Sequence, residues 1–244
     1  MNDFSITFVY NDISKNTWTD WKMLPIERPV INAPELKYVA INLAGADGEL
    51  DLSEALTPYP VYENRKGSLK FRLLNDSNKS ARAKRDEIMN FLHGKRMKMI
   101  LTEERSYYYI GRLTVSDFKY KGVRDWSDIV INYNLEPYKY DMIDSVEDWL
   151  WDPFNFETGV IRGYKNLVVD DFLKVVVVGS RKPVSAVINV ITSDPDFNVV
   201  VDLVQYPLVN GRNILPEVII GEGEKEFNFH GDGTITISFR GGWL

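Results

Sequence analysis

The sequence predicts a mainly β protein, with an N-terminal β-barrel or sandwich that includes one α-helix and a second β-sandwich at the C-terminus. Short segments in which every second residue is apolar recur along the chain, and this is the pattern of half-buried strands. Only residues 79–92 carry apolar side chains at helical spacing. We therefore expect residues 1–140 to form the first domain and residues 161–244 the second.

Composition limits the classes of protein to consider. The chain has 244 residues, of which 44% are hydrophobic, and this is enough for one large or two ordinary domains. It has no apolar run that could cross a membrane as a helix, and its start lacks the features of a signal peptide, so we expect synthesis in a cytoplasm. The absence of cysteine excludes disulfides and thiol chemistry. It fits either a reducing compartment or a particle that survives outside the cell.

The first elements are a strand over residues 5–10 and a pair of tryptophans, Trp18 and Trp21. The tryptophans suit either a sugar-stacking platform or packing in a core or subunit interface, and packing is favoured. Three prolines then punctuate residues 23–35. Because each proline removes a backbone donor, this segment is predicted to run extended along a surface.

The stretch over residues 48–72 contains a charged, irregular loop, residues 48–65, that lies between predicted strands at 36–43 and 68–74. We expect the Arg65 guanidinium to meet Asp51 or Glu54, and a desolvated Asp51–Arg65 pair would hold the loop in one shape. The predicted apolar anchors of the loop are Leu50, Leu52 and Leu56.

The predicted helix has N-cap candidates at residues 75–77 and a stop at Gly94. One face of it carries Ala81, Ile88, Phe91 and Leu92. Strands over residues 97–101 and 107–113, joined by a hairpin at 102–105, and a strand over 129–135 follow it.

Residues 141–160 mix acidic and aromatic side chains and are predicted to pack between the two domains. The second domain shows six short strands separated by turn residues, as expected of a sandwich. They are predicted over residues 172–178, 184–191, 197–205, 213–220, 225–230 and 234–240.

No constellation indicates catalysis, and we expect neither an enzyme nor a site for a metal or cofactor. Four acidic residues, Asp47, Glu49, Asp51 and Glu54, could in principle supply the two catalytic carboxylates of a glycosidase. Helix capping and ion pairing explain them more simply. The two histidines, His93 and His230, have no metal-ligand spacing around them. His93 is predicted to finish the helix as a cation at its C-terminus.

Positive charge is concentrated between Arg65 and Lys98, where eleven basic residues face three acidic ones in a chain of net charge −6. A DNA-contacting patch and one side of a charge-complementary subunit contact both fit this asymmetry. The acidic remainder of the chain favours the subunit contact, and no specific nucleic-acid binding is expected.

Several motifs together resemble one family. They are Ala44-Gly45-Ala46-Asp47-Gly48-Glu49-Leu50-Asp51-Leu52-Ser53-Glu54-Ala55-Leu56, Tyr62-Glu63-Asn64-Arg65, the helix end Phe91-Leu92-His93-Gly94-Lys95, and a Tyr-rich strand closing on Ile110-Gly111-Arg112. In this order they resemble the distal tail proteins (Dit) of long-tailed, siphovirus-type phages and prophages. The resemblance is strong over about the first 140 residues and continues, more weakly, through residues 231–240.

The resemblance implies a structural protein of the virion tail tip or baseplate, without a cofactor. About six copies would form a ring that joins the tail tube protein to the tail-tip hub protein, with the extended segment at 23–35 lying against a ring neighbour. The C-terminal sandwich would be galectin-like or carbohydrate-module-like, and in many members receptor-binding proteins attach there for host attachment.

The residues expected to serve this structure or its interfaces are Asp51, Leu52, Tyr62, Arg65, Gly94 and Gly111. The alternative function is a carbohydrate-binding adhesion module that acts through the C-terminal sandwich. Its stacking platforms would be Trp149, Trp151 or Trp243.

Overall fold

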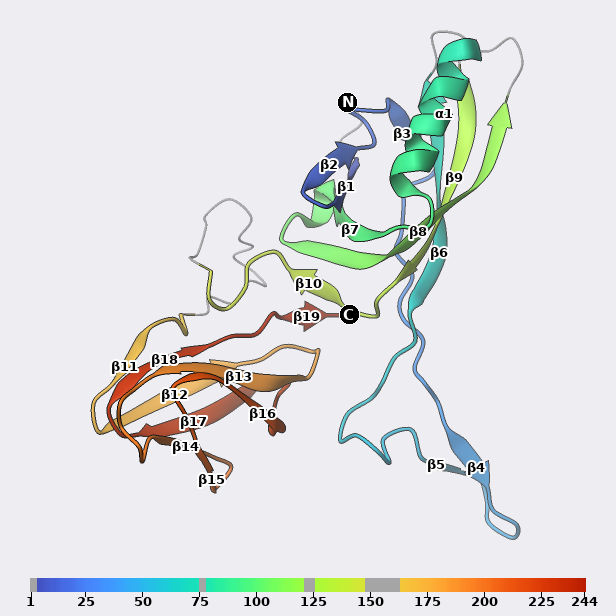
Figure 1. Ribbon diagram of the computed structural model, residues 1–244. Helices are drawn as coiled ribbons and strands as arrows, with labels where there is room; N and C mark the ends of the chain where they lie inside the picture. Colours follow the sequence, from blue (N-terminus) through green and yellow to red (C-terminus); the bar gives the residue numbers. More distant parts are fainter. Residues whose placement is uncertain (1–3, 75–77, 121–125, 148–162) are drawn as a thin grey trace. The chain divides into compact units, whose positions relative to one another are not determined.

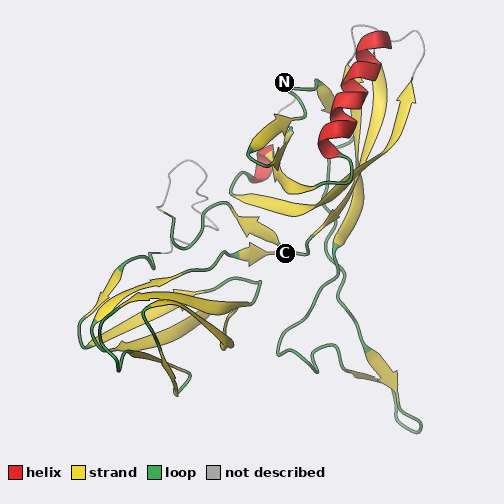
Figure 2. Ribbon diagram, viewed as in Figure 1, coloured by secondary structure: helices red, strands yellow, loops and turns green. Residues whose placement is uncertain are grey.

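The computed structural model describes residues 4–74, 78–120, 126–147 and 163–244 (Figure 1). The described part contains one α-helix and one short 3-10 turn, and its other regular elements are β-strands, which confirms the predicted mainly β fold class (Figure 2). The chain divides into two compact units, Met1–Lys139 with Leu244, and Tyr140–Trp243. Most of the predicted inter-domain segment, residues 148–160, lies outside the described residues. Within them, no helix has the length and apolar character needed to cross a membrane.

The N-terminal unit is a curled antiparallel sheet in the order β2-β1-β7-β8-β9-β6-β3. Its strands are β1 (Ile6–Tyr10), β2 (Ile13–Asn16), β3 (Met23–Pro25), β6 (Arg65–Leu74), β7 (Arg96–Leu101), β8 (Tyr107–Tyr120) and β9 (Trp126–Leu135). The turn η1 (Thr102–Glu104) joins β7 to β8. Apolar alternation explains the sheet: in β6 Leu69, Phe71 and Leu73 are buried while Lys70 is exposed.

The helix α1 (Asn78–Leu92) packs its apolar face into the core of this unit, as its spacing predicts. Ile88 and Leu92 are fully buried and Phe91 packs against the same core. Gly94 ends the helix with a φ of +77°, a conformation that favours glycine.

The two early tryptophans have separate environments. Trp21 is fully buried, with its ring 6.2 Å from that of Phe8 and 5.8 Å from that of Phe91. Its indole nitrogen donates to Glu87. Trp18 is 37% exposed and has the Lys22 ammonium over its ring. Trp21 is thus a core residue, and the pair does not form one stacking platform.

Residues 33–64, which we call the arm, leave the sheet after the proline-rich segment and return at β6. Between residues 24 and 64 no residue is buried. The arm ends in a two-stranded hairpin of β4 (Ala40–Asn42) and β5 (Glu49–Asp51), which Figure 1 shows away from the sheet of its own unit. The predicted strand over residues 36–43 is wrong in extent: only Ala40–Asn42 forms a strand, paired with β5, and Leu36 forms an isolated bridge to Tyr62.

The C-terminal unit is a sandwich of two four-stranded antiparallel sheets, in the orders β11-β18-β13-β16 and β12-β17-β14-β15. Its strands are β11 (Leu167–Val169), β12 (Phe172–Val178), β13 (Val184–Ile191), β14 (Asn198–Val201), β15 (Val204–Pro207), β16 (Gly211–Ile220), β17 (Glu224–His230) and β18 (Gly233–Ile237). The inward-facing residues of both sheets form one core that includes Val177, Ile188, Phe227 and Ile235.

One predicted strand of this unit is wrong. Residues 197–205 do not form a single strand, because Asp202 and Leu203 adopt φ values of +51° and +67° and turn the chain between β14 and β15. Two consecutive residues with positive φ make the tight hairpin turn that suits paired strands. Leu203 at this turn is 98% exposed.

Candidate functional site

The arm is fixed at its base by a buried arginine. Arg65, the first residue of β6, is only 4% exposed. Its Nε donates to the carbonyl of Pro137 at 2.8 Å, and its Nη1 donates to the carbonyl of Asn32 at 3.0 Å. Its Nη2 is the one buried side-chain nitrogen or oxygen, among the described residues, without a hydrogen-bond partner. Arg65 therefore ties the start of the arm to its return and to the chain after β9.

A second set of hydrogen bonds joins the same two chain segments. The backbone nitrogen of Asn32 donates to Tyr133 Oη at 3.1 Å, and the Asn32 Nδ2 donates to the carbonyl of Lys66 at 2.8 Å. Gly67 makes room for this arrangement, since a Cβ there would lie 2.6 Å from Tyr133 Cζ. The two ends of the arm are thus held side by side.

Tyr109 and Glu104 lie near the positive charge of Arg65 without forming a direct ion pair with it. Its guanidinium lies 5.7 Å from the centre of the Tyr109 ring, and the Tyr109 hydroxyl donates to Glu104 Oε2 at 3.0 Å. Glu104 also lies 3.6 Å from the Lys139 ammonium. Burial lowers the pKa of Arg65, and the neighbouring tyrosine and Glu104 charges act against this shift. The cluster is a polar anchor within the base of the arm.

Alkaline pH is expected to weaken the fold through Tyr109. Burial, reinforced by the charge of Glu104 and its hydrogen bond, raises the pKa of Tyr109 above its ordinary value of 10.0. The unfolded chain therefore loses this proton first, and stability falls as pH rises above about 10, by up to about 1.4 kcal/mol per pH unit for one proton. Urea titrations at pH 9 to 11.5 should show a shallower decline for Tyr109→Phe than for the parent. Equal slopes would contradict this origin.

The predicted pair between Asp51 and Arg65 is wrong. Asp51 lies in the exposed hairpin at the far end of the arm, whereas Arg65 is buried at the base (Figure 1). Asp51 instead accepts a hydrogen bond from the Ser53 backbone nitrogen at 2.8 Å, and hydrogen bonding to Ser53 lowers the pKa of its carboxyl. Glu54 is likewise exposed and forms no pair with Arg65.

The predicted apolar anchors of the loop are also not buried within one chain. Leu52 is half-buried and its backbone nitrogen donates to the carbonyl of Val39. Leu50 is 47% exposed and Leu56 is 99% exposed. These side chains form an uncovered apolar surface instead of a core.

The remaining predicted residues serve the N-terminal unit in different places. Tyr62 packs its ring edge-on against Tyr138 at 6.0 Å, next to the segment that receives Arg65. Gly111 lies in β8 opposite Leu135, which in turn is opposite Arg65 across β9. Gly94 lies at the helix end. The structure thus brings Tyr62 and Arg65 to the base of the arm, and Gly111 two strands away.

Sequence reasoning did not single out Asn32, Tyr133 or Pro137, which complete the base of the arm. They are separated from Arg65 by 33 residues for Asn32 and 72 for Pro137. The proline-punctuated segment before Asn32 is the one sequence signal that points there.

His93 lies directly after the end of α1. Its Nδ1 accepts a hydrogen bond from the Val115 backbone nitrogen at 3.1 Å. The histidine joins the end of α1 to β8.

The four acidic residues considered for a glycosidase pair lie together at the exposed end of the arm. Asp47, Glu49, Asp51 and Glu54 lie on or beside an exposed hairpin, and no group of His, Cys, Asp and Glu in the described ranges could hold a metal ion. Of the three tryptophans proposed as sugar platforms, Trp149 and Trp151 lie outside the described residues. Trp243, in β19 (Gly242–Trp243), donates from its ring to Asp141 of β10 (Lys139–Asp141) at 2.8 Å.

The outward face of the N-terminal sheet carries a row of cations. Lys66 of β6 is opposite Asn134 of β9, which is opposite Arg112 of β8, which is opposite Arg96 of β7. Lys66, Asn134, Arg112 and Arg96 are all exposed, and residues opposite one another on neighbouring strands lie on the same face of the sheet. Lys98 lies two residues along β7 on the same face. We call Lys66, Arg96, Lys98 and Arg112 the basic strip.

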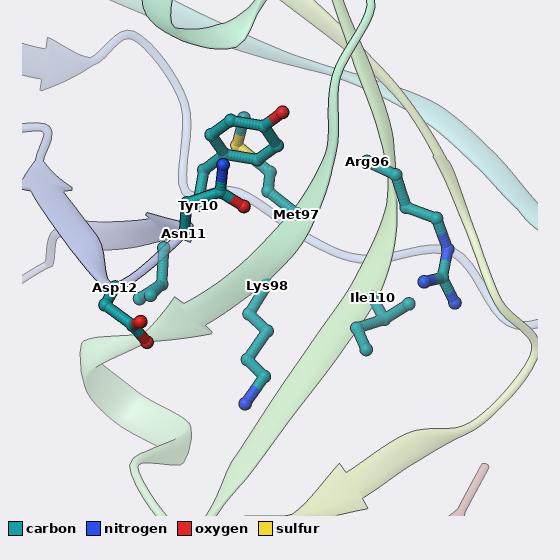
Figure 3. A pocket seen from close by; sticks show the side chains of 8 residues that line it. Tyr10, Asn11, Asp12, Arg96, Met97, Lys98 and Ile110 are labelled. Carbon is teal, nitrogen blue, oxygen red and sulfur yellow. The ribbon is translucent and has the colours of Figure 1, made fainter.

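A groove of about 410 Å³ lies at one end of the basic strip. Its lining includes Arg96 and Lys98 of β7, Ile110 of β8, and Tyr10 and Asp12 at the β1–β2 turn (Figure 3). The Arg96 guanidinium forms an ion pair with Glu136. The groove therefore combines apolar surface with cations and is open to solvent.

No protein-family model matches the sequence, and no curated protein matches it. Among solved structures, the chain is similar to the SPP1 Dit (gp 19.1) protein, described as a paradigm of the hub adsorption apparatus in phages that infect Gram-positive bacteria. The TM-score is 0.57 at 13% sequence identity, over 97% of this chain and 98% of that chain. The chain has the fold of that Dit protein. The resemblance drawn from the sequence motifs is thus supported at the level of the fold.

Proposed function

We propose that this chain is a structural protein of a phage tail tip, and that about six copies of it form a closed ring through the N-terminal domain, residues 1–140. The ring joins the tail tube protein on one side to the tail-tip hub protein on the other. The C-terminal sandwich, residues 161–244, lies outside the ring and receives receptor-binding proteins. The protein has no catalytic role or cofactor and works in the virion tail.

The observation that carries the proposal is the arm. Its exposed large apolar side chains are Leu36, Tyr38, Val39, Ile41, Leu43, Leu50 and Leu56. An isolated two-stranded hairpin is at best marginally stable in water, and exposed apolar patches of this kind mark contacts with a partner. A neighbour in a ring covers such an arm on every copy, because a head-to-tail contact repeated around a circle leaves no free end.

The base of the arm supports the same reading. Arg65, Asn32 and Tyr133 hold the two ends of the arm by hydrogen bonds although no residue of the arm is buried. A segment fixed at its base and uncovered along its length is prepared to contact another molecule, since less conformational freedom is lost on binding.

Light scattering on the purified protein tests the proposal. We expect the parent to have about six times the 28.2 kDa mass of the chain, and a variant in which a short Gly-Ser linker replaces residues 33–64 to be a folded monomer by circular dichroism. The linker can close the gap because Asn32 and Lys66 are already in contact.

Two matched single variants test whether assembly depends on the apolar side chains of the arm or on exposed apolar side chains in general. Leu56 in the arm is 99% exposed and Leu203 in the C-terminal unit is 98% exposed. Leu56→Ser is expected to weaken assembly, and Leu203→Ser is expected to leave it unchanged. If the parent protein remains a monomer at high concentration, in low salt and with its tail partners present, the proposal is wrong.

A further inference from the structure

The tip of the arm is acidic as well as apolar. Residues 40–56 contain Asp47, Glu49, Asp51 and Glu54 and no basic residue. All four are exposed, and none forms an ion pair with a described residue. This part of the chain thus presents four uncompensated carboxylates.

The hairpin sorts its side chains onto two faces. Glu49 and Asp51 are two residues apart in β5 and so share one face, while Leu50 and its partner Ile41 share the other. The rise of a strand places Glu49 and Asp51 about 6.7 Å apart along β5. The Tyr38 hydroxyl donates to Glu49 at 3.3 Å on the same hairpin.

The basic strip repeats this spacing with the opposite charge. Arg96 and Lys98 are also two residues apart on one face of a strand, hence about 6.7 Å apart along β7. Lys66 and Lys98 form no ion pair with a described residue, and Lys98 lies 4.9 Å over the ring of Tyr108. Glu136 pairs with Arg96, and Asp12 lines the groove. The strip itself contains four cations and no carboxylate.

The groove adds apolar surface beside these cations. Figure 3 shows Lys98 in the groove between Asp12 and Ile110, with Tyr10 also on the lining. Val9, Tyr10 and Ile110 are half-buried there. The acidic face of the hairpin fits the cations of this surface in charge, while Leu50 and Ile41 lie on the opposite face of the hairpin.

We propose that the β4–β5 hairpin of one copy binds the basic strip and groove of a second copy, with the Glu49 and Asp51 carboxylates against the strip cations. This inference rests on the proposed ring and names the surface that receives the arm. It also gives a role to Lys66, Arg96 and Lys98, three of the eleven basic residues between Arg65 and Lys98.

A charge-swap experiment tests the contact. The strip variant Lys66→Glu/Lys98→Glu and the hairpin variant Glu49→Lys/Asp51→Lys are each expected to remain folded by circular dichroism. Each should raise the apparent dissociation constant of assembly, measured by sedimentation, by about tenfold or more. The four-residue combination should restore assembly to within about threefold of the parent. A control, Arg82→Glu/Arg212→Glu, makes the same change in net charge at exposed positions outside the strip and should assemble as the parent does.

The outcomes distinguish this inference from the ring itself. If the parent forms rings and the strip variant forms them equally well at low and high salt, the strip does not receive the arm, although the ring stands. If both double variants weaken assembly but their combination does not restore it, the two surfaces do not meet. If the parent binds labelled double-stranded DNA and the strip variant loses only that binding, nucleic acid is the occupant and the inference is overturned. A parent that never assembles refutes the proposed function instead.

Discussion

Replacing Gly111 by alanine is expected to destabilise the N-terminal unit by about 3 kcal/mol or more, among the largest effects of any single methyl group in the chain. A Cβ at this position would lie 2.5 Å from Leu135 Cα and would overlap the carbonyl oxygen of Asn134. Both atoms belong to the backbone of β9, so relief requires β8 and β9 to separate. Denaturant unfolding followed by circular dichroism measures the loss.

Gly221→Ala is the matched control. Gly221 has no atom within 4 Å of an added Cβ, and its φ is not in the left-handed region. Its substitution should change the free energy of unfolding by less than about 0.5 kcal/mol. Equal effects of the two variants would show that the close approach of β8 and β9 at Gly111 is not a constraint.

Arg65→Ala is expected to lower the free energy of unfolding by about 2 to 4 kcal/mol. The carbonyls of Asn32 and Pro137 each lose a hydrogen bond from a charged donor, worth about 1.5 to 3 kcal/mol, and relief from burying the charge offsets part of the sum. Arg65→Lys should not restore stability, because a single ammonium cannot reproduce the two directions of the guanidinium.

The same substitution should release the base of the arm. Hydrogen exchange is expected to be faster at residues 30–33 and 65–67 in Arg65→Ala than in the parent, since the Asn32 contact is lost. The neighbouring Lys66→Ala removes an exposed side chain and should leave stability and exchange unchanged within error. An Arg65→Ala protein as stable as the parent would mean that the buried arginine contributes nothing to the arm base.

Much of the fold follows from local patterns in the sequence. Alternation in β6, the helical spacing of Ile88 and Leu92, and the stop at Gly94 predict their elements because burial selects apolar residues at the period of each structure. Such patterns indicate which side chains are buried. In the two compact units, other residues of the same chain cover these side chains.

The pattern fails at the arm, where no described part of the chain covers the apolar residues. Leu50 and Leu56 have the same apolar character as core residues, yet they are exposed, and the sequence pattern does not distinguish the two cases. The predicted pairing of Asp51 with Arg65 relied on their closeness in sequence. The partners of Arg65 are instead backbone carbonyls far along the chain. At Asp202 and Leu203 the turn has no glycine, so composition gives no sign of the positive φ values.

The ring is tested most directly by electron microscopy of the purified protein in negative stain. The account predicts annular particles whose class averages show a closed rotational symmetry of about six copies, and their absence from preparations that lack residues 33–64. Particles of single-chain size in the parent preparation, at high concentration, in low salt and with the tail partners added, would contradict it.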